Sequence, residues 1–241
     1  MHFNVGFKTD VGRKRKQNQD NAVSAPELGL FVVADGMGGH QGGEIASAIV
    51  VDAMPQVVEN SRKAQPWDPK IVLQKSIGLA NELIHKKGHE QPHLQGMGTT
   101  TVAMLFDDGL LTVGHVGDSR CYVIRQSALW QVTRDHSLVQ EKLRAGLINR
   151  AQLRTDKMKN VITRSVGYEP HVSVETYEMK TQPGDIFLIC SDGLSGLMDD
   201  SEILGVVQKE SSDLQKTAEA LVALANENGG DDNVTAILVQ V

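Results

Sequence analysis

Runs of apolar residues bounded by turn-forming residues recur along the chain and predict a series of buried strands. These predicted strands span residues 3–8, 30–35, 99–106, 110–116, 121–125, 129–133, 172–179, 185–191 and 234–241. Apolar residues at helical spacing predict helices over residues 43–60, 69–87, 201–209 and 213–226.

The order of these elements indicates the fold class. The strands within 99–133 follow one another through short turns such as Asp107-Asp108-Gly109, which favours antiparallel hairpins. The helices come in adjacent pairs, one after residue 36 and one near the end of the chain. Clustered strands and clustered helices predict an α+β fold in which helices cover the outside of two mainly antiparallel sheets.

No long linker or low-complexity tract interrupts the chain, so we expect a single domain over residues 1–241. Residues 143–167 are polar and basic, and we expect them to form a surface flap segment with a short helix or two. An ordinary solvated insertion is the alternative for this segment.

Aspartates stand where the predicted strands end. Asp35 follows the run 30–34, Asp118 follows 111–116, Asp192 follows 186–191, and Asp232 precedes the last run. Like charges brought together from distant parts of the sequence are costly unless a positive group lies among them. Carboxylate oxygens are the ligands that Mg²⁺ and Mn²⁺ prefer, so the pattern predicts a divalent-metal site.

A basic stretch near the N-terminus offers a group for a phosphate. It covers residues 13–16 and contains Arg15, with a further carboxylate, Asp20, five residues later. Two ions about 4 Å apart can activate a water and hold a phosphoryl oxygen, and a planar guanidinium can take the remaining oxygens.

The bulk composition excludes other classes. The formal net charge is −6 over 241 residues, which gives no reason to expect a nucleic-acid surface. No apolar run approaches the roughly 20 residues that span a bilayer, and the N-terminus lacks the shape of a signal peptide. Cys121 and Cys190 both lie in apolar runs, so we expect no disulfide and a cytoplasmic location. Nothing in the sequence indicates an oligomer, and a monomer is the simplest expectation.

Three histidines are spaced four residues apart. On a helix, His85, His89 and His93 could bind Zn²⁺. Gly88 and Pro92 argue against a helix here, so we expect a loop of exposed histidines.

Ordered motifs along nearly the whole chain carry a family resemblance. They are TDVGRKRKQNQD (9–20), VADGMGGH (33–40), GTT (98–100), HVGDSR (115–120), DHS (135–137), CSDGL (190–194) and GGDDNVT (229–235). With these motifs the chain resembles the metal-dependent serine/threonine protein phosphatases of the PPM or PP2C type, in their short bacterial form. The resemblance implies a four-layer αββα sandwich.

The resemblance also implies a set of metal ligands. Asp35 would bridge two Mn²⁺ or Mg²⁺ ions, and Gly36 would give its carbonyl to one of them. Asp192 and Asp232 would complete the other, while Asp118 and Asp192 would form a third, weaker site.

The remaining roles implied by the resemblance concern the substrate. Arg15 would hold the substrate phosphate, and Asp20 would support a metal-bound water. The flap segment would affect substrate choice. Met37 stands where animal members carry a histidine proposed as general acid, so the proton donor is left open.

The implied reaction is hydrolysis of phosphoserine or phosphothreonine on proteins by a water held between the ions. The partners would be phosphorylated proteins, the products of a serine/threonine kinase. The alternative is a non-catalytic pseudo-phosphatase that binds phosphoproteins, which would predict loss of a metal-binding Asp or of Arg15; both kinds of residue are present.

Overall fold

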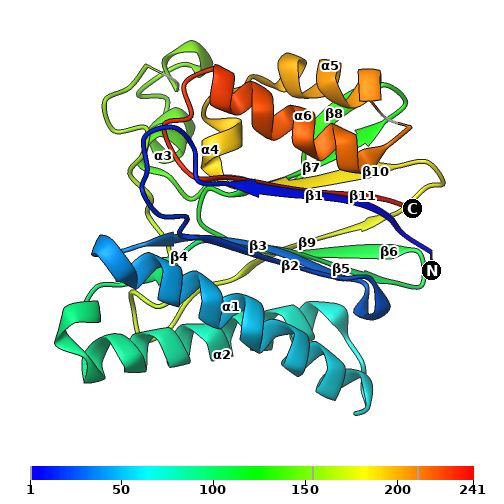
Figure 1. The fold of residues 1–241 in the computed structure, drawn as a ribbon. Helices are drawn as coiled ribbons and strands as arrows, with labels where there is room; N and C mark the ends of the chain where they lie inside the picture. The colour runs from blue at the N-terminus through cyan, green and yellow to red at the C-terminus, as the bar shows by residue number, and fades with distance from the viewer. Residues whose placement is uncertain (1, 154, 211) are drawn as a thin grey trace.

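Two β-sheets lie face to face, and helices cover the outer face of each (Figure 1). The structure, a computed structural model, describes residues 2–153, 155–210 and 212–241, leaving aside the side chains of residues 39–41. The predicted α+β class and the four-layer αββα sandwich are therefore confirmed.

The first sheet joins the two ends of the chain. Its strand order is β1-β11-β10-β7-β8, and neighbouring strands are antiparallel. The strands are β1 (Asn4–Asp10), β11 (Val234–Gln240), β10 (Ile186–Cys190), β7 (Arg120–Arg125) and β8 (Ala128–Gln131). Val5 stands opposite Val239, so the first and last strands pair directly.

The second sheet has the order β2-β3-β5-β6-β9 and is also antiparallel, with β4 paired to the end of β3. Its strands are β2 (Asp20–Ala25), β3 (Leu30–Met37), β4 (Gly98–Thr99), β5 (Thr101–Asp107), β6 (Leu110–Val116) and β9 (Glu175–Lys180).

Each sheet has its own helix pair. Helices α1 (Gly39–Arg62) and α2 (Pro69–Glu90) pack on the second sheet, and α5 (Asp200–Glu210) and α6 (Leu214–Glu227) pack on the first. The remaining helical segments are α3 (Leu138–Arg144), α4 (Asp192–Ser195) and the 3-10 turns η1 (Pro26–Leu28), η2 (Pro92–Leu94) and η3 (Arg150–Gln152). Helices α3 and α4 lie at the end of the sandwich opposite the chain termini (Figure 1).

Local signals explain where the long helices begin. Asp68 accepts hydrogen bonds from the backbone N–H groups of Lys70 and Ile71, and Pro69 occupies the first turn, where no N–H is needed. Asp213 caps α6 in the same way through the N–H of Lys216. Among the described residues no helix has both the length and the apolar character needed to cross a membrane.

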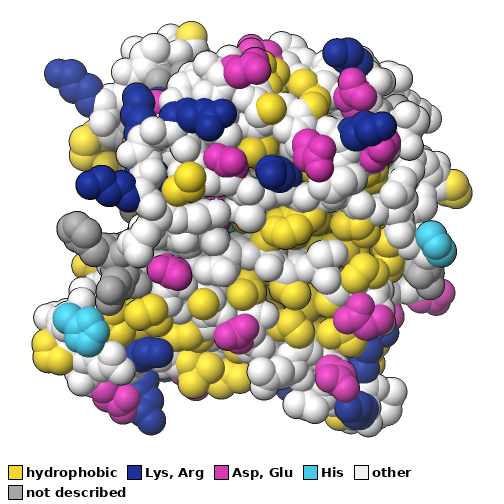
Figure 2. Space-filling model, viewed as in Figure 1, with side chains coloured by type: hydrophobic (Ala, Val, Ile, Leu, Met, Phe, Trp, Pro, Cys, Tyr) yellow, Lys and Arg dark blue, Asp and Glu magenta, His cyan; other side chains and the backbone are white. Residues whose placement is uncertain are grey.

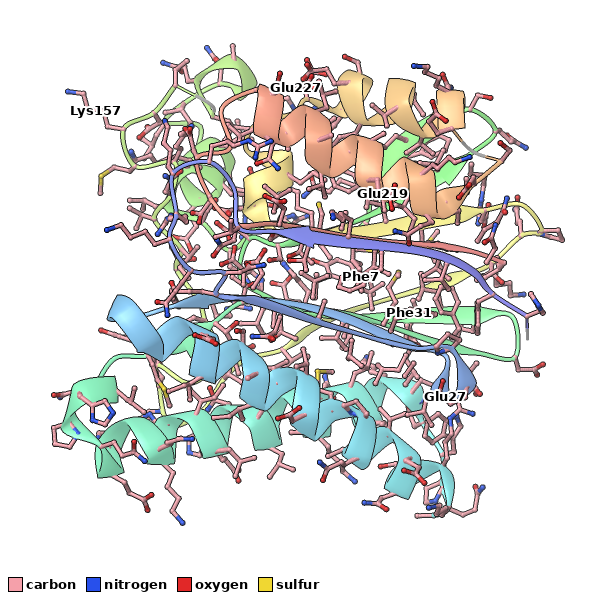
Figure 3. The ribbon with its side chains drawn as sticks, in the orientation of Figure 1. Phe7, Glu27, Phe31, Lys157, Glu219 and Glu227 are labelled. Atoms are coloured by element: carbon pink, nitrogen blue, oxygen red, sulfur yellow. The ribbon has the colours of Figure 1, made fainter. Side chains whose placement is uncertain are left out.

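A third apolar cluster fills the space between the sheets. Phe31, Phe106 and Phe187 form a chain of edge-on ring contacts, 5.9 Å and 5.4 Å between centroids. Phe31 lies in this layer, toward the end that holds the chain termini, whereas Phe7 lies at its edge (Figure 3). Hydrophobic side chains also follow the seam between the two halves of the molecule (Figure 2).

The sequence missed three local features. Strand β2 was not predicted, because its short, half-buried sequence DNAVSA carries little apolar pattern. The four-residue helix α4 was also missed, and the helix expected in the flap segment begins earlier, at Leu138.

The expected loop of exposed histidines was wrong for two of the three residues. Helix α2 continues through Gly88 to Glu90, so His85 and His89 lie on a helix one turn apart. Gly88 is buried beneath Leu94, whose carbonyl oxygen would be 3.3 Å from an added Cβ. Close packing, not backbone bending, therefore explains this glycine.

Candidate active site

The predicted aspartates meet at one end of the layer between the sheets. In the pairing of β2 with β3, Asp20 stands directly opposite Asp35. Asp192 begins α4 just after β10, and its carboxyl group lies close to that of Asp35. Segments from both sheets therefore bring three carboxyl groups together.

The backbone around Asp35 is fixed by β4 and the residue after it. The Asp35 carbonyl accepts hydrogen bonds from the Thr100 N–H (2.8 Å) and the Thr99 hydroxyl (2.8 Å), and the Asp35 N–H donates to the Thr100 hydroxyl (3.1 Å). Gly36 has no room for a side chain, because an added Cβ would lie 2.1 Å from the Gly43 carbonyl oxygen. The position of Asp35 is thus set by main-chain contacts rather than by its own side chain.

Asp20 is held by two hydroxyl groups from the first sheet. Ser191 and Thr235 each donate a hydrogen bond to Asp20 Oδ2, at 2.8 Å and 2.7 Å. The Thr235 hydroxyl also bonds to Thr9, 2.8 Å away. Asp20 is almost fully buried and does not reach the cavity, so it lies behind the carboxylates that do.

Asn233 connects the loops that surround the site. Its side-chain oxygen accepts from the Gln19 N–H (2.8 Å), and its amide donates to the carbonyls of Val11 and Gln17, both at 2.9 Å. No role was predicted for Ser191, Thr235 and Asn233, although all three lie inside the quoted motifs. Each is directly adjacent in sequence to Asp192, Val234 or Asp232, and this adjacency was the signal from which a role near the site could have been predicted.

The turn that carries Asp118 is fixed from the opposite side. Gly117 has a φ of 109° and its added Cβ would meet the Thr100 side chain at 2.6 Å, so only glycine fits. The Gly117 N–H donates to His136 Nδ1 (3.0 Å), and the Gly117 carbonyl accepts from the His136 N–H (2.8 Å). Thr100 and Ser119 hydroxyls, 2.7 Å apart, complete the contact.

Arg15 forms an ion pair with Asp232, Nη2 to Oδ2 2.6 Å. Both side chains are partly exposed, and both line the cavity above the buried carboxyl groups. The guanidinium thus lies at the rim of the acidic cluster, at the end of a basic loop whose neighbour Lys14 pairs with Asp231.

The electrostatics of the cluster favour binding of a cation. Burial, and then the charges of nearby aspartates, raise the pKa of Asp35 and Asp118 well above the usual range. Burial raises the pKa of Asp20 to about 7, despite the hydroxyl groups that lower it. Burial and the charge of Asp232 also raise the pKa of Asp192. A divalent cation would relieve this repulsion.

Two carboxylate oxygens of the cluster also lack partners among the described residues. Oδ1 of Asp20 and Oδ1 of Asp192 are buried and accept no hydrogen bond from the described residues. Buried acceptors of this kind ordinarily have a partner. Oxygen donors alone suit Mg²⁺ or Mn²⁺ rather than a softer metal.

The side chains as they stand do not form a complete ligand shell. In the described part of the chain, no three His, Cys, Asp or Glu side chains share one metal position. The pairing of Asp232 with Arg15 turns one carboxylate toward the rim. The carboxylate donors and the two unpartnered oxygens fit divalent ions. To join them in binding an ion, the Asp232 side chain would rotate away from Arg15.

Two cavities adjoin each other at the cluster. One, of about 710 Å³, is lined by Asp35, Asp192, Asp232 and Arg15, among others. The second, of about 720 Å³, shares Asp118, Asp192 and Asn160 with it. The flap segment contributes to both walls, chiefly to the second, through residues Leu143, Arg150, Ala151, Leu153, Lys159, Asn160 and Ile162.

A buried carboxylate cluster with an arginine at its rim is typical of divalent-metal centres that handle phosphate. Comparison with known proteins gives the same class. The family model for Protein phosphatase 2C matches residues 7–234. The chain therefore belongs to the protein phosphatase 2C family.

Individual relatives cover nearly the whole chain. The serine/threonine phosphatase stp of Listeria monocytogenes serotype 4b is 35% identical, over 97% of this chain and 94% of the relative. The crystal structure of the Mycobacterium tuberculosis serine/threonine phosphatase PstP/Ppp matches with a TM-score of 0.92 at 31% identity, covering 99% of this chain and 98% of that one. A structure of the catalytic domain of PstP in complex with 2 manganese ions matches at 0.89 and 32% identity, covering 99% and 97%.

Proposed function

We propose that this protein hydrolyses phosphoserine and phosphothreonine esters on other proteins, with two divalent ions, Mn²⁺ or Mg²⁺, in the carboxylate cluster. The observation that carries the proposal is the convergence of Asp35, Asp192 and Asp232 beside Arg15 in one cavity. The manganese ions of the related PstP structure support the same assignment. A pseudo-phosphatase is disfavoured, because the acidic ligands and Arg15 are all present.

Asp35, the Gly36 carbonyl, Asp192 and Asp232 would hold the two ions. When bound, such ions lower the pKa of a water and draw electron density from a phosphoryl oxygen. Asp35 would be a central ligand, because its backbone is anchored by Thr99 and Thr100 while its carboxyl group lies close to Asp192.

The protein's own groups orient the reaction. Arg15 would leave Asp232 and bind two oxygens of the substrate phosphate through its planar guanidinium. Asp20, fixed by Ser191 and Thr235, has Oδ1 left to accept a hydrogen bond from a water in the cluster.

Asp118 would bind a third, weaker ion together with Asp192. The support is position, since both side chains line the two adjoining cavities. The flap segment would contact the peptide on either side of the phosphorylated residue, because it forms one wall of the second cavity. The substrates would be products of a serine/threonine kinase, and the enzyme would act as a cytoplasmic monomer.

The decisive experiment measures phosphate release from a phosphothreonine peptide, with Mn²⁺ and with excess chelator. We expect turnover in Mn²⁺ and none above background in chelator. Equal rates in the two conditions would refute the metal-dependent reaction.

A second experiment tests the role of Arg15. Arg15→Ala should mainly raise KM, by about ten- to a hundredfold, because it removes a charged contact worth roughly 1.5–3 kcal/mol. Lys16→Ala is the matched control from the same basic loop and should change KM much less. A fall in kcat with KM unchanged would show that Arg15 acts only in the transition state.

A further inference from the structure

Two histidines on α2 point ring nitrogens toward each other. His85 and His89 are one helical turn apart, and the distance between their Nε2 atoms is 3.1 Å. Their ring planes are inclined by 77°, with 4.4 Å between centroids. His85 is half-buried and His89 is exposed, so solvent reaches the pair from one side.

A backbone contact sets the tautomer of His85. Its Nδ1 lies 3.3 Å from the carbonyl oxygen of Gly167, and a carbonyl can only accept, so Nδ1 carries the proton. In the neutral ring, Nε2 of His85 then presents a lone pair toward His89. A histidine ligand that gives its other ring proton to a backbone carbonyl is the usual arrangement at metal sites.

We propose that His85 and His89 form a bidentate site for a transition-metal ion such as Ni²⁺ or Zn²⁺, separate from the carboxylate centre. Nitrogens 3.1 Å apart can both lie about 2.05 Å from one ion, with an angle of roughly 100° at the metal. His89, whose Nε2–H now faces His85, would shift its proton to Nδ1 through solvent and free the second lone pair. Because the described residues supply no third ligand here, water would complete the coordination.

The two sites differ in ligand type and should therefore bind different ions. Imidazole nitrogen suits Zn²⁺, Ni²⁺ and Cu²⁺, whereas Mg²⁺ requires oxygen. The histidine pair therefore would not compete for Mg²⁺ in the carboxylate cluster, and failure of one site leaves the other intact.

The pair also touches the end of the flap segment. Gly167 donates its N–H to Asn81 (2.6 Å), and its backbone is so close to Ile84 that an added Cβ would lie 2.1 Å from that side chain. An ion on His85 and His89 would fix the His85 ring against this contact. Bound metal should therefore slow amide hydrogen exchange at Gly167.

The test is isothermal titration of Ni²⁺ into the whole protein with Mg²⁺ in large excess. We expect the wild type to bind one more Ni²⁺ than His89→Ala does at the same Ni²⁺ concentration. In the variant, the remaining His85 should bind Ni²⁺ at least tenfold more weakly than the pair does. His93→Ala is the matched control: it removes an exposed histidine from the adjacent turn and should retain the full stoichiometry.

Two results would overturn the proposal. One is equal Ni²⁺ stoichiometry and affinity in the wild type and His89→Ala. The other is loss of the same equivalent in His93→Ala, which would place the ion elsewhere. Because His89 is exposed, its replacement should leave folding and phosphatase turnover in Mg²⁺ unchanged, and hydrogen exchange at Gly167 gives an independent readout of occupancy.

Discussion

The two ends of the layer between the sheets are built from the same strands but have opposite character. On β3, Phe31 and Val33 point into this layer and are followed, at the same spacing of two residues, by Asp35. On β11, Ile237 lies in the apolar part of the layer, and Thr235 lies at its polar end, where it contacts Asp20. Each strand therefore passes from an apolar end near the chain termini to a polar end at the cavity.

The difference between the ends is one of free energy. The apolar end removes aromatic surface from water, which stabilises the fold. The acidic end buries carboxyl groups whose pKa values are raised by that burial and by one another, which costs stability when they ionise. The protein thus uses one end of the layer for folding and the other for chemistry.

The largest expected effect comes from the acidic end. Asp35→Asn should lower phosphate release by about a hundredfold or more, because a central charged ligand is lost. In chelator its melting temperature should not fall, since asparagine carries no charge whereas the buried Asp35 carboxyl group ionises only at a cost. The measurements are steady-state kinetics in Mn²⁺ and thermal unfolding in chelator.

Asp108→Asn is the matched control for that change. Asp108 lies in the turn between β5 and β6, far from the cavity, with a φ of 44° that asparagine tolerates. Turnover should be unchanged. Retention of activity in Asp35→Asn would contradict the assignment of chemistry to this end.

The second effect, on stability, comes from the apolar end. Phe31→Ala should reduce the free energy of unfolding by about 3–5 kcal/mol, because it leaves a cavity among Phe106 and its neighbours. Phe7→Ala, at the edge of the same layer and 36% exposed, should cost much less. Urea unfolding gives both values, and kcat per folded molecule should hold in each.

If Phe31→Ala instead reduced kcat while the free energy of unfolding stayed the same, the division between the two ends would be wrong. Equal losses of stability in Phe31→Ala and Phe7→Ala would also contradict it. In that case the aromatic contacts of Phe31 would contribute no more to the free energy of unfolding than the contacts of Phe7 at the edge of the layer.

Much of this division could be predicted from the sequence. Strand 110–116 was predicted with its observed bounds, and the helix pairs and antiparallel pairing followed from the order of elements. Alternation along a strand places Phe31 and Asp35 on one face, so their shared layer is a local property.

The partners of the aspartates could not be predicted in the same way. The contact between Asp20 and Ser191 spans 171 positions in sequence, and β2 itself was missed. No local pattern specifies which strands from two sheets will meet, or that Asn233 will hold the loop between β1 and β2 at three points. The pairing of Arg15 with Asp232 was likewise outside what the spacing indicated.

A third, smaller effect concerns the hydroxyl groups that hold Asp20. Ser191→Ala removes one of two donors to Oδ2 and should weaken Mn²⁺ affinity or turnover by about ten- to a hundredfold. Thr235→Val removes the other and should act through the same carboxylate, so the double variant should lose less than the sum of the two single effects. Additive losses in the full cycle would show that Ser191 and Thr235 act independently of Asp20.

The smallest effect is the pH dependence of stability without metal. The pKa of Asp20 is raised from 3.8 to about 7 in the folded protein, so its neutral form is favoured there. Its contribution to stability is therefore complete below pH 4 and decreases as the pH rises through about 7. In chelator, the melting temperature of the wild type should fall relative to that of Asp20→Asn. The expected fall is about 3–5 °C for each pH unit between the two pKa values of 3.8 and about 7.

Asparagine at position 20 is a suitable reference, because its carbonyl oxygen can still accept the hydrogen bonds of Ser191 and Thr235 without carrying a charge. Saturating Mn²⁺ should remove the pH-dependent difference, since a bound cation favours the ionised carboxylates. Parallel melting curves for the two proteins between pH 5 and 8 in chelator would mean that Asp20 ionises without cost. The acidic end would then carry no energetic penalty at this position, and the contrast with the aromatic end would rest on Asp35, Asp118 and Asp192 alone.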